Sequence, residues 1–137
     1  MGRIMAIDYG TKRTGLAVTD PLKIVAGPLD TIATHLLVDF LKGYLAKEEV
    51  ESIVIGDPRR LNGEMSETTH LTNQFVNKLK KEIPTIKIVR MDERFTSKIA
   101  EKSVLTMGLP KMKRQDKSLI DKVSATIILQ DYLNTIA

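Results

Sequence analysis

Residues 5–20, with the sequence MAIDYGTKRTGLAVTD, set the beginning of the fold. The segments 3–9 and 13–19 are mostly apolar and rich in the residues that favour strands. A short turn of Gly, Thr, Lys and Arg separates them. This pattern predicts a β-hairpin at the start of the chain.

Asp8 is the unusual residue of this hairpin. Alternation along a strand places it on one face with Ile4 and Ala6, and the opposite face is apolar as well. A strand that is apolar on both faces is expected at the centre of a covered sheet. A carboxylate buried there is costly unless it is protonated, paired or bound to a metal. Asp8 is therefore either a functional carboxylate or a strand-end residue that accepts N–H bonds from the turn.

The rest of the chain predicts three more strands and four helices. A third strand is expected over 23–33, where Pro28 indicates a bulge or an edge position. Thr34 is expected to cap a helix that continues to about Glu49. The remaining expected elements are a strand over 52–55 that ends at Gly56, a loop over 57–67, a helix that ends before Pro84, a strand over 86–91 and helices over about 96–108 and 118–136.

This order predicts the fold class. An antiparallel meander followed by alternating helices and strands gives an α/β fold. Its sheet should be mixed and five-stranded, with helices on both faces. At 137 residues, the sequence is expected to form a single domain over 1–137.

The composition excludes several kinds of site and of protein. The sequence has no cysteine, which excludes disulfides and thiolate metal sites. No apolar stretch is long enough to cross a membrane, and Asp8 and Tyr9 interrupt any signal-peptide core at the N-terminus. We therefore expect a soluble, cytoplasmic protein without a membrane partner.

Positive charge favours a polyanionic partner. The 21 Lys and Arg residues exceed the 17 Asp and Glu residues, which gives a net charge of +4. Several basic residues fall in segments that read as turns or loops: Lys12, Arg13, Arg59, Arg60, Lys111, Lys113, Arg114 and Lys117. They are either a solvated surface or one electropositive face.

Two further acids accompany Asp8 as candidates. Glu93 extends an apolar face at the carboxyl end of the fifth strand, where sites in α/β sheets gather, although it could also belong to a surface ion-pair cluster with Asp92 and Arg94. Asp121 heads a core-facing stripe of the last helix, although Ser118 and Asp121 also match a capping box.

Together, Asp8, Glu93 and Asp121 are the kind of set that a magnesium site needs. Mg²⁺ prefers oxygen ligands and is held by a few carboxylates together with substrate phosphates. In two-metal hydrolysis of phosphodiesters, the ions activate water and stabilise the leaving oxygen. The two histidines, His35 and His70, are expected near helix surfaces and lack zinc spacing.

Four segments resemble, in order, the motifs of one family. They are IDYGTKRTGLAVTD, IVIGDPRRLNG, MDERFTS and KSLIDKVSATIILQDYL, which together resemble the YqgF (RuvX) family of pre-16S rRNA nucleases, also described as Holliday junction resolvase-like. The resemblance implies an RNase H-like fold and a nuclease dependent on Mg²⁺ or Mn²⁺. Its role would be to mature the 5′ end of small-subunit ribosomal RNA.

The resemblance also implies roles for individual residues. Asp8, Glu93 and Asp121 would be the catalytic carboxylates and metal ligands. Arg13, Arg94 and Lys117 would contact phosphate or orient the acids. Gly10 and Gly15 would allow a tight turn and a close approach of the backbone.

The sequence departs from the family's motifs at two positions, and three alternative functions remain open. Asp57 stands between Gly56 and Pro58, where the family has an apolar residue, and Ser124 stands where junction resolvases carry a further acid. That serine makes a DNA junction substrate less favoured than a ribosomal RNA precursor. The rivals are such a resolvase, which would require a homodimer, a non-catalytic RNA-binding assembly factor, and an ATP-binding protein of the actin and sugar-kinase class. The sequence does not decide the oligomeric state, which is either a monomer or a homodimer.

Overall fold

The computed structural model describes residues 2–57, 67–92 and 117–136, and its strands follow the predicted order. β1 (Arg3–Asp8) and β2 (Arg13–Thr19) form the predicted hairpin, which β3 (Ala26–Ala33) extends. The remaining elements are the 3-10 helix η1 (Thr34–Leu36), α1 (Leu37–Lys47), β4 (Val50–Asp57), α2 (Glu67–Glu82), β5 (Lys87–Asp92) and α5 (Lys117–Ile136).

The five strands form one mixed sheet in the order β3-β2-β1-β4-β5. β1, β2 and β3 pair antiparallel as a meander, whereas β4 runs parallel to both β1 and β5. β1 is the central strand, and Met5, Ala6 and Ile7 are fully buried. Its apolar residues on both faces explain this position, because only a strand covered on both sides buries them all.

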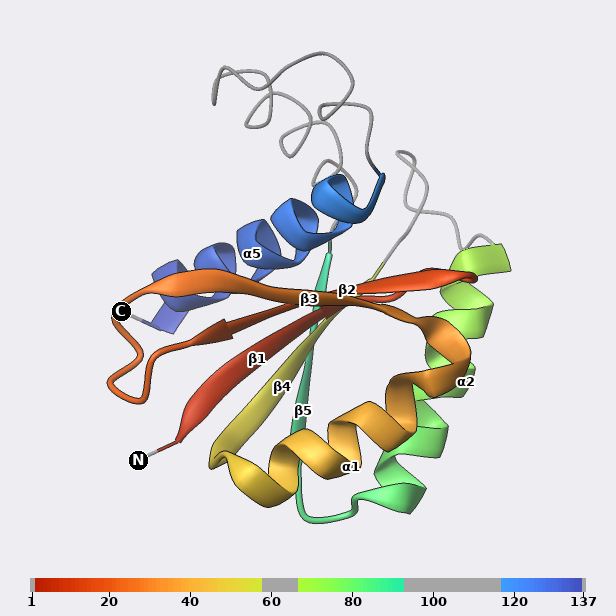
Figure 1. Cartoon of the computed structure of the whole chain (residues 1–137), viewed down its shortest axis with the longest axis horizontal. Helices are drawn as coiled ribbons and strands as arrows, with labels where there is room; N and C mark the ends of the chain where they lie inside the picture. Colours follow the sequence, from red (N-terminus) through yellow and green to blue (C-terminus); the bar gives the residue numbers. More distant parts are fainter. Residues whose placement is uncertain (1, 58–66, 93–116, 137) are drawn as a thin grey trace.

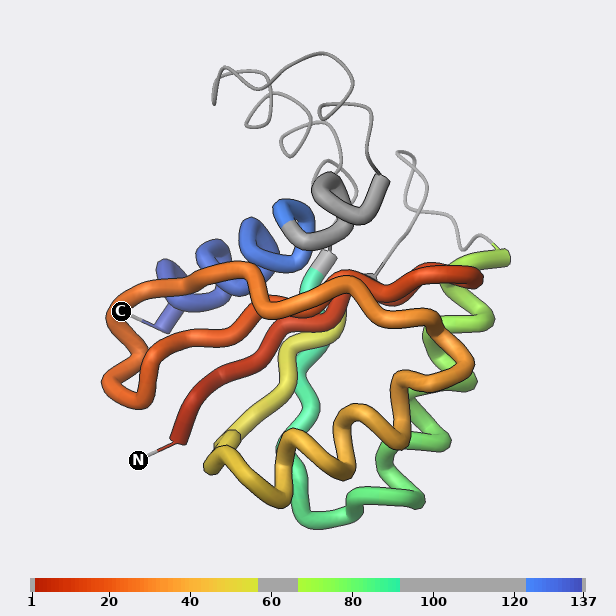
Figure 2. Tube along the Cα trace, viewed as in Figure 1, coloured from red at the N-terminus to blue at the C-terminus, as the bar shows by residue number. Residues whose placement is uncertain are grey.

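Helices cover both faces of the sheet, as predicted (Figure 1). On one face, α1 and α2 form a core with the strands through Met5, Ile7, Ile55, Leu41 and Phe75, among others. On the other face, α5 contributes Ala125, Ile128, Leu129 and Leu133 to a second core with Ile4 and Ala6. The trace in Figure 2 shows α5 lying across the sheet on the side away from α1.

The third strand lies at an edge of the sheet and contains a bulge, as Pro28 indicated, but it begins later than predicted. β3 is an edge strand, and its register with β2 shifts between Asp30 and Pro28, so that Leu29 is the extra residue of a bulge. The strand begins at Ala26 rather than at residue 23. The backbone N–H groups of residues 22, 24 and 25 donate to the carboxylate of Asp20, which holds this segment in a closed loop.

Thr34 does not cap the helix, contrary to the prediction. α1 begins only at Leu37, after η1, and neither helix has a side-chain cap. The hydroxyl of Thr34 donates instead to the carbonyl oxygen of Gly10 at 2.6 Å. The helix also ends at Lys47, two residues earlier than expected.

The other boundaries are close to the expected ones. β4 begins at Val50 rather than at residue 52, and α5 begins at Lys117 rather than at about residue 118. The helix predicted over 96–108 lies outside the described residues. Within the described ranges, none of the helices combines the length and the apolar character that a membrane span requires.

Candidate active site

Asp8 is the last residue of the central strand and is half-buried. It pairs with Gly15 of β2, and Ile7 before it pairs with Ile55 of β4. Ile4 and Ala6 belong to the α5 core, whereas Met5 and Ile7 belong to the core under α1 and α2. Strand alternation therefore places Asp8 on the α5 face, as the sequence predicts.

The strands on one side of β1 end at the same edge as Asp8. β4 is parallel to β1 and ends at Asp57, and β5 is parallel to β4 and ends at Asp92, which pairs with Asp57. The carboxyl ends of three parallel strands therefore meet at one edge of the sheet, where sites in open α/β sheets form. Glu93 comes directly after Asp92 in the chain but lies outside the described residues.

The first turns of α5 lie toward the same edge. The C-terminal turns of the helix share a hollow with Lys23 and Ile24 of the β2–β3 loop, which lies beside the amino end of β1. The helix therefore crosses the sheet with its N-terminal turns toward the carboxyl end of β1 (Figure 1). Asp121 is four residues before the buried Ala125, on the same helical stripe, and its side chain lies outside the described part.

Ser118 and Asp121 both belong to the first turns of α5, which begins at Lys117. Ser124, at the position of a further acid in junction resolvases, is 2% exposed. His35 and His70 are exposed on η1 and α2, as predicted.

A ring of hydrogen bonds fixes the turn beside Asp8. Thr34 Oγ1 donates to the carbonyl oxygen of Gly10 (2.6 Å), and the Gly10 N–H donates to Thr14 Oγ1 (3.5 Å). The two hydroxyl oxygens are 3.0 Å apart. Since a threonine hydroxyl has one hydrogen and Thr34 uses its own on Gly10, Thr14 donates to Thr34. The ring therefore begins and ends on Gly10.

The turn also needs a glycine at position 10. A Cβ atom there would overlap the carbonyl oxygen of Arg13. The Thr34 N–H adds a bond to the carbonyl oxygen of Lys12 at 3.0 Å. Gly15, which the sequence groups with Gly10, lies inside β2 opposite Asp8 and not in the turn. The side chains of Lys12 and Arg13 are exposed on this fixed turn.

Sequence reasoning missed the part that Thr14 and Thr34 play in this ring. The two residues are 20 positions apart, and Thr34 is 24 positions from Gly10, so no local pattern joins them. The one signal in the sequence was a threonine, Thr14, within the predicted strand 13–19. The structure buries it fully, and a buried polar side chain requires a hydrogen-bond partner.

Several predicted site residues cannot be placed. Arg59, Arg60, Arg94, Lys111, Lys113 and Arg114 lie outside the described residues, as does the side chain of Lys117. The described side chains include no group of three or more Asp, Glu or His residues that could hold a metal ion. The side chains of Glu93 and Asp121 are not among the described ones.

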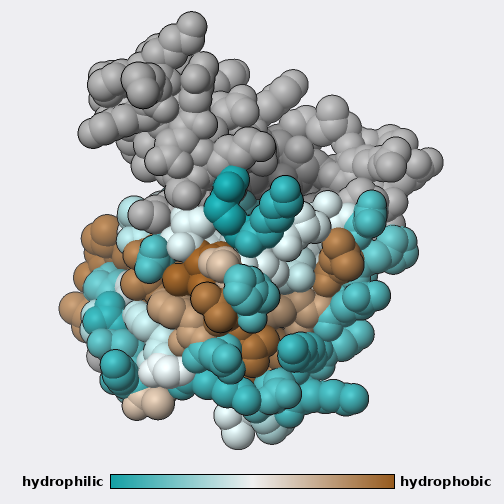
Figure 3. Space-filling model, turned by 45° about the vertical axis from the view of Figure 1, so that its right-hand side comes forward, coloured by the Kyte–Doolittle hydropathy of each residue, from teal (hydrophilic) through white to brown (hydrophobic). Residues whose placement is uncertain are grey.

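A groove of about 510 Å³ lies on the opposite face, between α1 and α2. Its lining includes Tyr9, which stacks on Phe75, and the ion pair of Lys42 with Glu82 at 2.7 Å. Figure 3 shows apolar side chains in the middle of this side of the molecule, surrounded by hydrophilic ones. The groove reaches Thr11 but not Asp8, so the carboxylate edge and the groove are separate features.

Comparison with known proteins identifies what the chain resembles. A family model described as "RuvX: Holliday junction resolvase" matches residues 2–135. A protein of Porphyromonas gingivalis is 57% identical over 134 residues, which cover 98% of this chain and 97% of that protein. One of Flavobacterium johnsoniae is 54% identical over 135 residues, with 98% of both chains covered. Both carry the name "Putative pre-16S rRNA nuclease".

Solved structures share the fold at low sequence identity. RuvC of Thermus thermophilus matches with a TM-score of 0.57 and 14% identity, covering 98% of this chain and 96% of that one. The T. thermophilus RuvC structure in complex with a Holliday junction substrate matches with a TM-score of 0.56 and 13% identity, covering 100% and 97%. These matches confirm the predicted RNase H-like fold.

Proposed function

The chain belongs to the RuvX family, and from this premise we propose that it is a divalent-metal-dependent nuclease acting on a precursor of 16S ribosomal RNA. The proposed metal ligands and catalytic carboxylates are Asp8, Glu93 and Asp121. The proposed metal is Mg²⁺ or Mn²⁺, because a site of carboxylates without cysteine suits hard cations.

The position of Asp8 carries this proposal. It is a half-buried carboxylate at the carboxyl end of the central strand, on the face that α5 covers. β5 ends at the same edge with Asp92, and Glu93 is the next residue in the chain and lies outside the described residues. Asp121 belongs to the N-terminal turns of the helix that crosses toward this edge. The proposed site therefore takes Asp8 from β1, Asp121 from α5 and Glu93 from the segment that follows β5.

The residues present fit a divalent metal ion. Such an ion, when bound, would activate a water molecule and stabilise the leaving oxygen of a phosphodiester. The carboxylates would hold and orient it, and the burial of Asp8 would restrict the directions from which water can approach. Packing of Ile4 and Ala6 beneath α5 keeps the strand that carries Asp8 in place.

The fixed turn supports a role in binding the phosphate backbone. Lys12 and Arg13 are exposed on a turn that the Gly10 ring holds in one conformation. Cations on a preorganised turn lose little conformational entropy when they bind phosphate. The other proposed phosphate contacts are Arg59, Arg60, Arg94, Lys113, Arg114 and Lys117.

Cleavage of a defined substrate tests the proposal. A labelled 16S rRNA precursor with its 5′ leader is incubated with Mg²⁺ or Mn²⁺, and we expect cleavage that EDTA and Asp8→Asn abolish. Asp131→Asn serves as the control, because Asp131 is exposed on α5 and far along the helix from its first turns. Equal cleavage by the wild type and Asp8→Asn would refute the assigned site.

A DNA junction is the second candidate substrate. The family description and the RuvC complex with a Holliday junction favour it. A four-way DNA junction is therefore included in the same assay. Cleavage of the junction alone would replace the RNA substrate in the proposal and keep the carboxylates. RNA binding without cleavage, equal in the wild type and Asp8→Asn, would favour an assembly factor.

A further inference from the structure

The groove between α1 and α2 adjoins the turn that carries the proposed phosphate contacts. Its volume of about 510 Å³ falls within the range of ligand sites, roughly 300–1,000 Å³. Thr11 and Thr34 line it, and the hydroxyl of Thr34 also donates to the Gly10 carbonyl oxygen within the turn. Lys12 and Arg13 follow Thr11 in the chain and are exposed. The groove and the cations of the turn are therefore neighbours on the surface.

A stacked aromatic pair lines the groove near this turn. The rings of Tyr9 and Phe75 have centroids 5.0 Å apart and an interplanar angle of 22°. Phe75 is 7% exposed, whereas Tyr9 is half-buried, so the accessible part of the pair belongs mainly to Tyr9. Packing on Phe75 holds the Tyr9 ring in one plane. A fixed aromatic ring at the surface is a stacking platform for a nucleobase, and every base can use it.

Groups that can pair with the edges of bases accompany the ring. Gln74 precedes Phe75 on α2, and His35 lies on η1; both line the groove and are exposed. The glutamine amide offers both donors and an acceptor, and the neutral imidazole offers one of each. The edges of nucleobases also combine donors and acceptors. The groove thus has one stacking ring and two groups suited to hydrogen bonds with a base.

The carboxylates of the groove lie farther from the turn. Both helices run away from the carboxyl ends of the parallel strands, since α1 follows η1 and leads to the start of β4, and α2 leads from the end of β4 to the start of β5. Asp39 comes four residues after His35, about 6 Å along the helix. Glu82 comes eight residues after Gln74, about 12 Å along, and is paired with Lys42 at 2.7 Å. The described lining nearest the turn therefore carries no carboxylate that would repel a phosphate.

The groove and Asp8 lie on opposite faces of the sheet but meet at the end of β1. Tyr9 packs against the core under α1 and α2, whereas Asp8, the residue before it, lies on the α5 face. Their Cα atoms are about 3.8 Å apart. A nucleic acid that reaches both must turn sharply around this end of β1. Duplex DNA, with a persistence length of about 50 nm, resists such a turn, whereas an unpaired chain of nucleotides lacks this stiffness.

We propose that the groove binds unpaired nucleotides of the substrate next to the bond that is cut. The inference rests on the proposed function and adds the class of substrate: an RNA with a single-stranded segment beside the cleavage position. Tyr9 stacks on one base of this segment, and Gln74 and His35 form hydrogen bonds with base edges. Lys12 and Arg13 contact the phosphates that cross the turn between the carboxylate edge and the groove. A fully paired junction arm offers no such segment, so the proposal favours the RNA precursor.

Binding of a labelled oligouridine, followed by fluorescence anisotropy in EDTA, tests the groove without cleavage. Tyr9→Leu should raise the dissociation constant by about five- to hundredfold, because it removes the stacking ring and keeps an apolar side chain. Tyr44→Leu is the matched control. Tyr44 also stacks on a phenylalanine, Phe40, but neither residue lines the groove, and the dissociation constant should equal that of the wild type.

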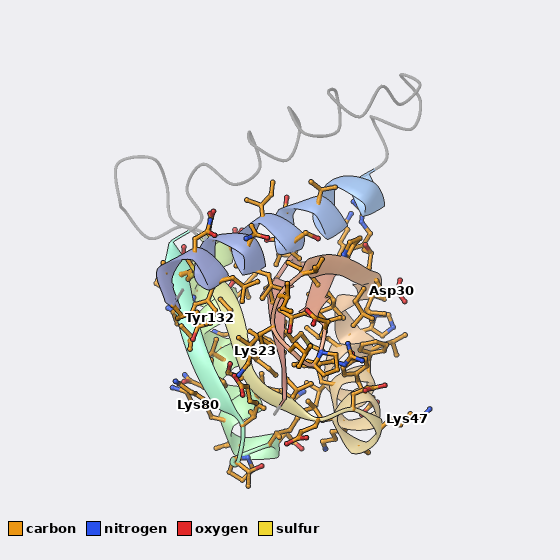
Figure 4. The ribbon with its side chains drawn as sticks, turned by 90° about the vertical axis from the view of Figure 1, so that its left-hand side faces the viewer. Lys23, Asp30, Lys47, Lys80 and Tyr132 are labelled. Atoms are coloured by element: carbon orange, nitrogen blue, oxygen red, sulfur yellow. The ribbon has the colours of Figure 1, made fainter. Side chains whose placement is uncertain are left out.

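A second variant leaves the packing of the groove intact. Gln74→Glu replaces an exposed amide with a carboxylate of the same shape and should weaken binding by about two- to tenfold. Asn77→Asp makes the same change at an exposed position of α2 outside the groove. Lys80→Gln lowers the net charge equally, at a side chain that points outward beside β5 (Figure 4). Both controls should bind oligouridine as the wild type does.

A fully paired RNA of the same length separates the groove from the turn. Its affinity should be equal for the wild type and Tyr9→Leu, since no unpaired base reaches the ring. Cross-linking gives a readout that does not depend on affinity. Oligouridine that carries iodouridine should cross-link on irradiation to the peptide that contains Tyr9.

The outcomes separate this inference from the nuclease activity. Binding that depends on Tyr9, together with no cleavage of any substrate, would refute the activity and support the groove. Equal affinities of the wild type, Tyr9→Leu and Gln74→Glu for oligouridine would overturn the groove, even where Asp8→Asn abolishes cleavage. A wild type that does not bind oligouridine would overturn it as well.

Discussion

Gly10 is the residue of the β1–β2 turn that tolerates no side chain. It is the point where the hydrogen-bond ring through Thr14 and Thr34 begins and ends, and the Arg13 carbonyl oxygen occupies the space of a Cβ atom. At the residue scale, the conformation of the turn beside Asp8 therefore depends on one missing side chain and two hydroxyl groups.

Gly10→Ala should destabilise the protein by about 1–3 kcal/mol, because the turn must shift to relieve the overlap. Urea unfolding measures this change. Gly43→Ala is the control, since nothing lies within 4 Å of a Cβ atom at Gly43 in α1, and alanine there should stabilise the helix by up to about 1 kcal/mol. Equal effects of the two substitutions would contradict the assigned clash.

Thr34→Val keeps the shape of the side chain and removes its hydroxyl. We expect a loss of stability of about 1–3 kcal/mol, because the Gly10 carbonyl oxygen and the Thr14 hydroxyl both lose a partner. The affinity for labelled RNA should fall as the turn loses its fixed conformation. Thr11→Val, at an exposed position of the same turn, should leave both quantities close to wild type.

At the scale of elements, the faces and the order of the strands were predictable from the sequence. The alternation that places Ile4 and Ala6 opposite Met5 and Ile7 follows from the strand repeat alone, and both cores confirm it. The start of β3 was not predictable, because Ile24 and Val25 are β-branched residues that favour a strand. Asp20 excludes them through bonds that depend on the closed loop.

Asp20→Asn should destabilise the protein in a manner that depends on pH. The N–H of Val25, followed by those of Ile24 and Leu22, holds the pKa of the Asp20 carboxyl below its ordinary value of 3.8. A lowered pKa in the folded state stabilises the protein above the pKa of the unfolded chain. This contribution disappears as the pH falls through the lowered value.

Urea unfolding at a series of pH values measures this effect. The difference in unfolding free energy between wild type and Asp20→Asn should be constant near neutral pH and shrink in acid. A difference that does not change with pH would show that the charge of Asp20 does not stabilise the loop.

Leu129→Ala should cost about 2–5 kcal/mol, because Leu129 is fully buried between α5 and the sheet. Gln130→Ala, at the adjacent exposed position, should change stability little. Thermal unfolding followed by circular dichroism compares the two. A small loss for Leu129→Ala would mean that α5 is not firmly packed on the sheet.

At the scale of the whole molecule, the carboxyl ends of the parallel strands form the proposed site. The sequence indicated Asp8 and the order of the strands along the chain, whereas the parallel pairing that brings the carboxyl ends of β1, β4 and β5 to one edge comes from the structure. The hydrogen-bond ring on Gly10 could not be predicted from the sequence, because Thr14 and Thr34 come together only after β3 has folded beside β2.

Binding of Mg²⁺ should raise the unfolding temperature of the wild type. A ligand at a hundredfold excess over its dissociation constant stabilises a protein by about 2.7 kcal/mol. Asp8→Asn should reduce this shift, and Asp131→Asn should retain it. A thermal-shift titration without nucleic acid measures both, and an equal shift in the two variants would remove Asp8 from the metal site.

Pro28 and the bulge at Leu29 also determine whether another strand can pair with the β3 edge of the sheet. A proline has no N–H to offer a further strand, and a bulge breaks the regular spacing of the free groups on an edge. Asp30 adds an exposed charge on this strand. The β3 edge of the sheet is thereby protected against growth by strand addition, which is the first step of amyloid-like aggregation. The protein can therefore be concentrated without its β3 edge becoming a template for other chains.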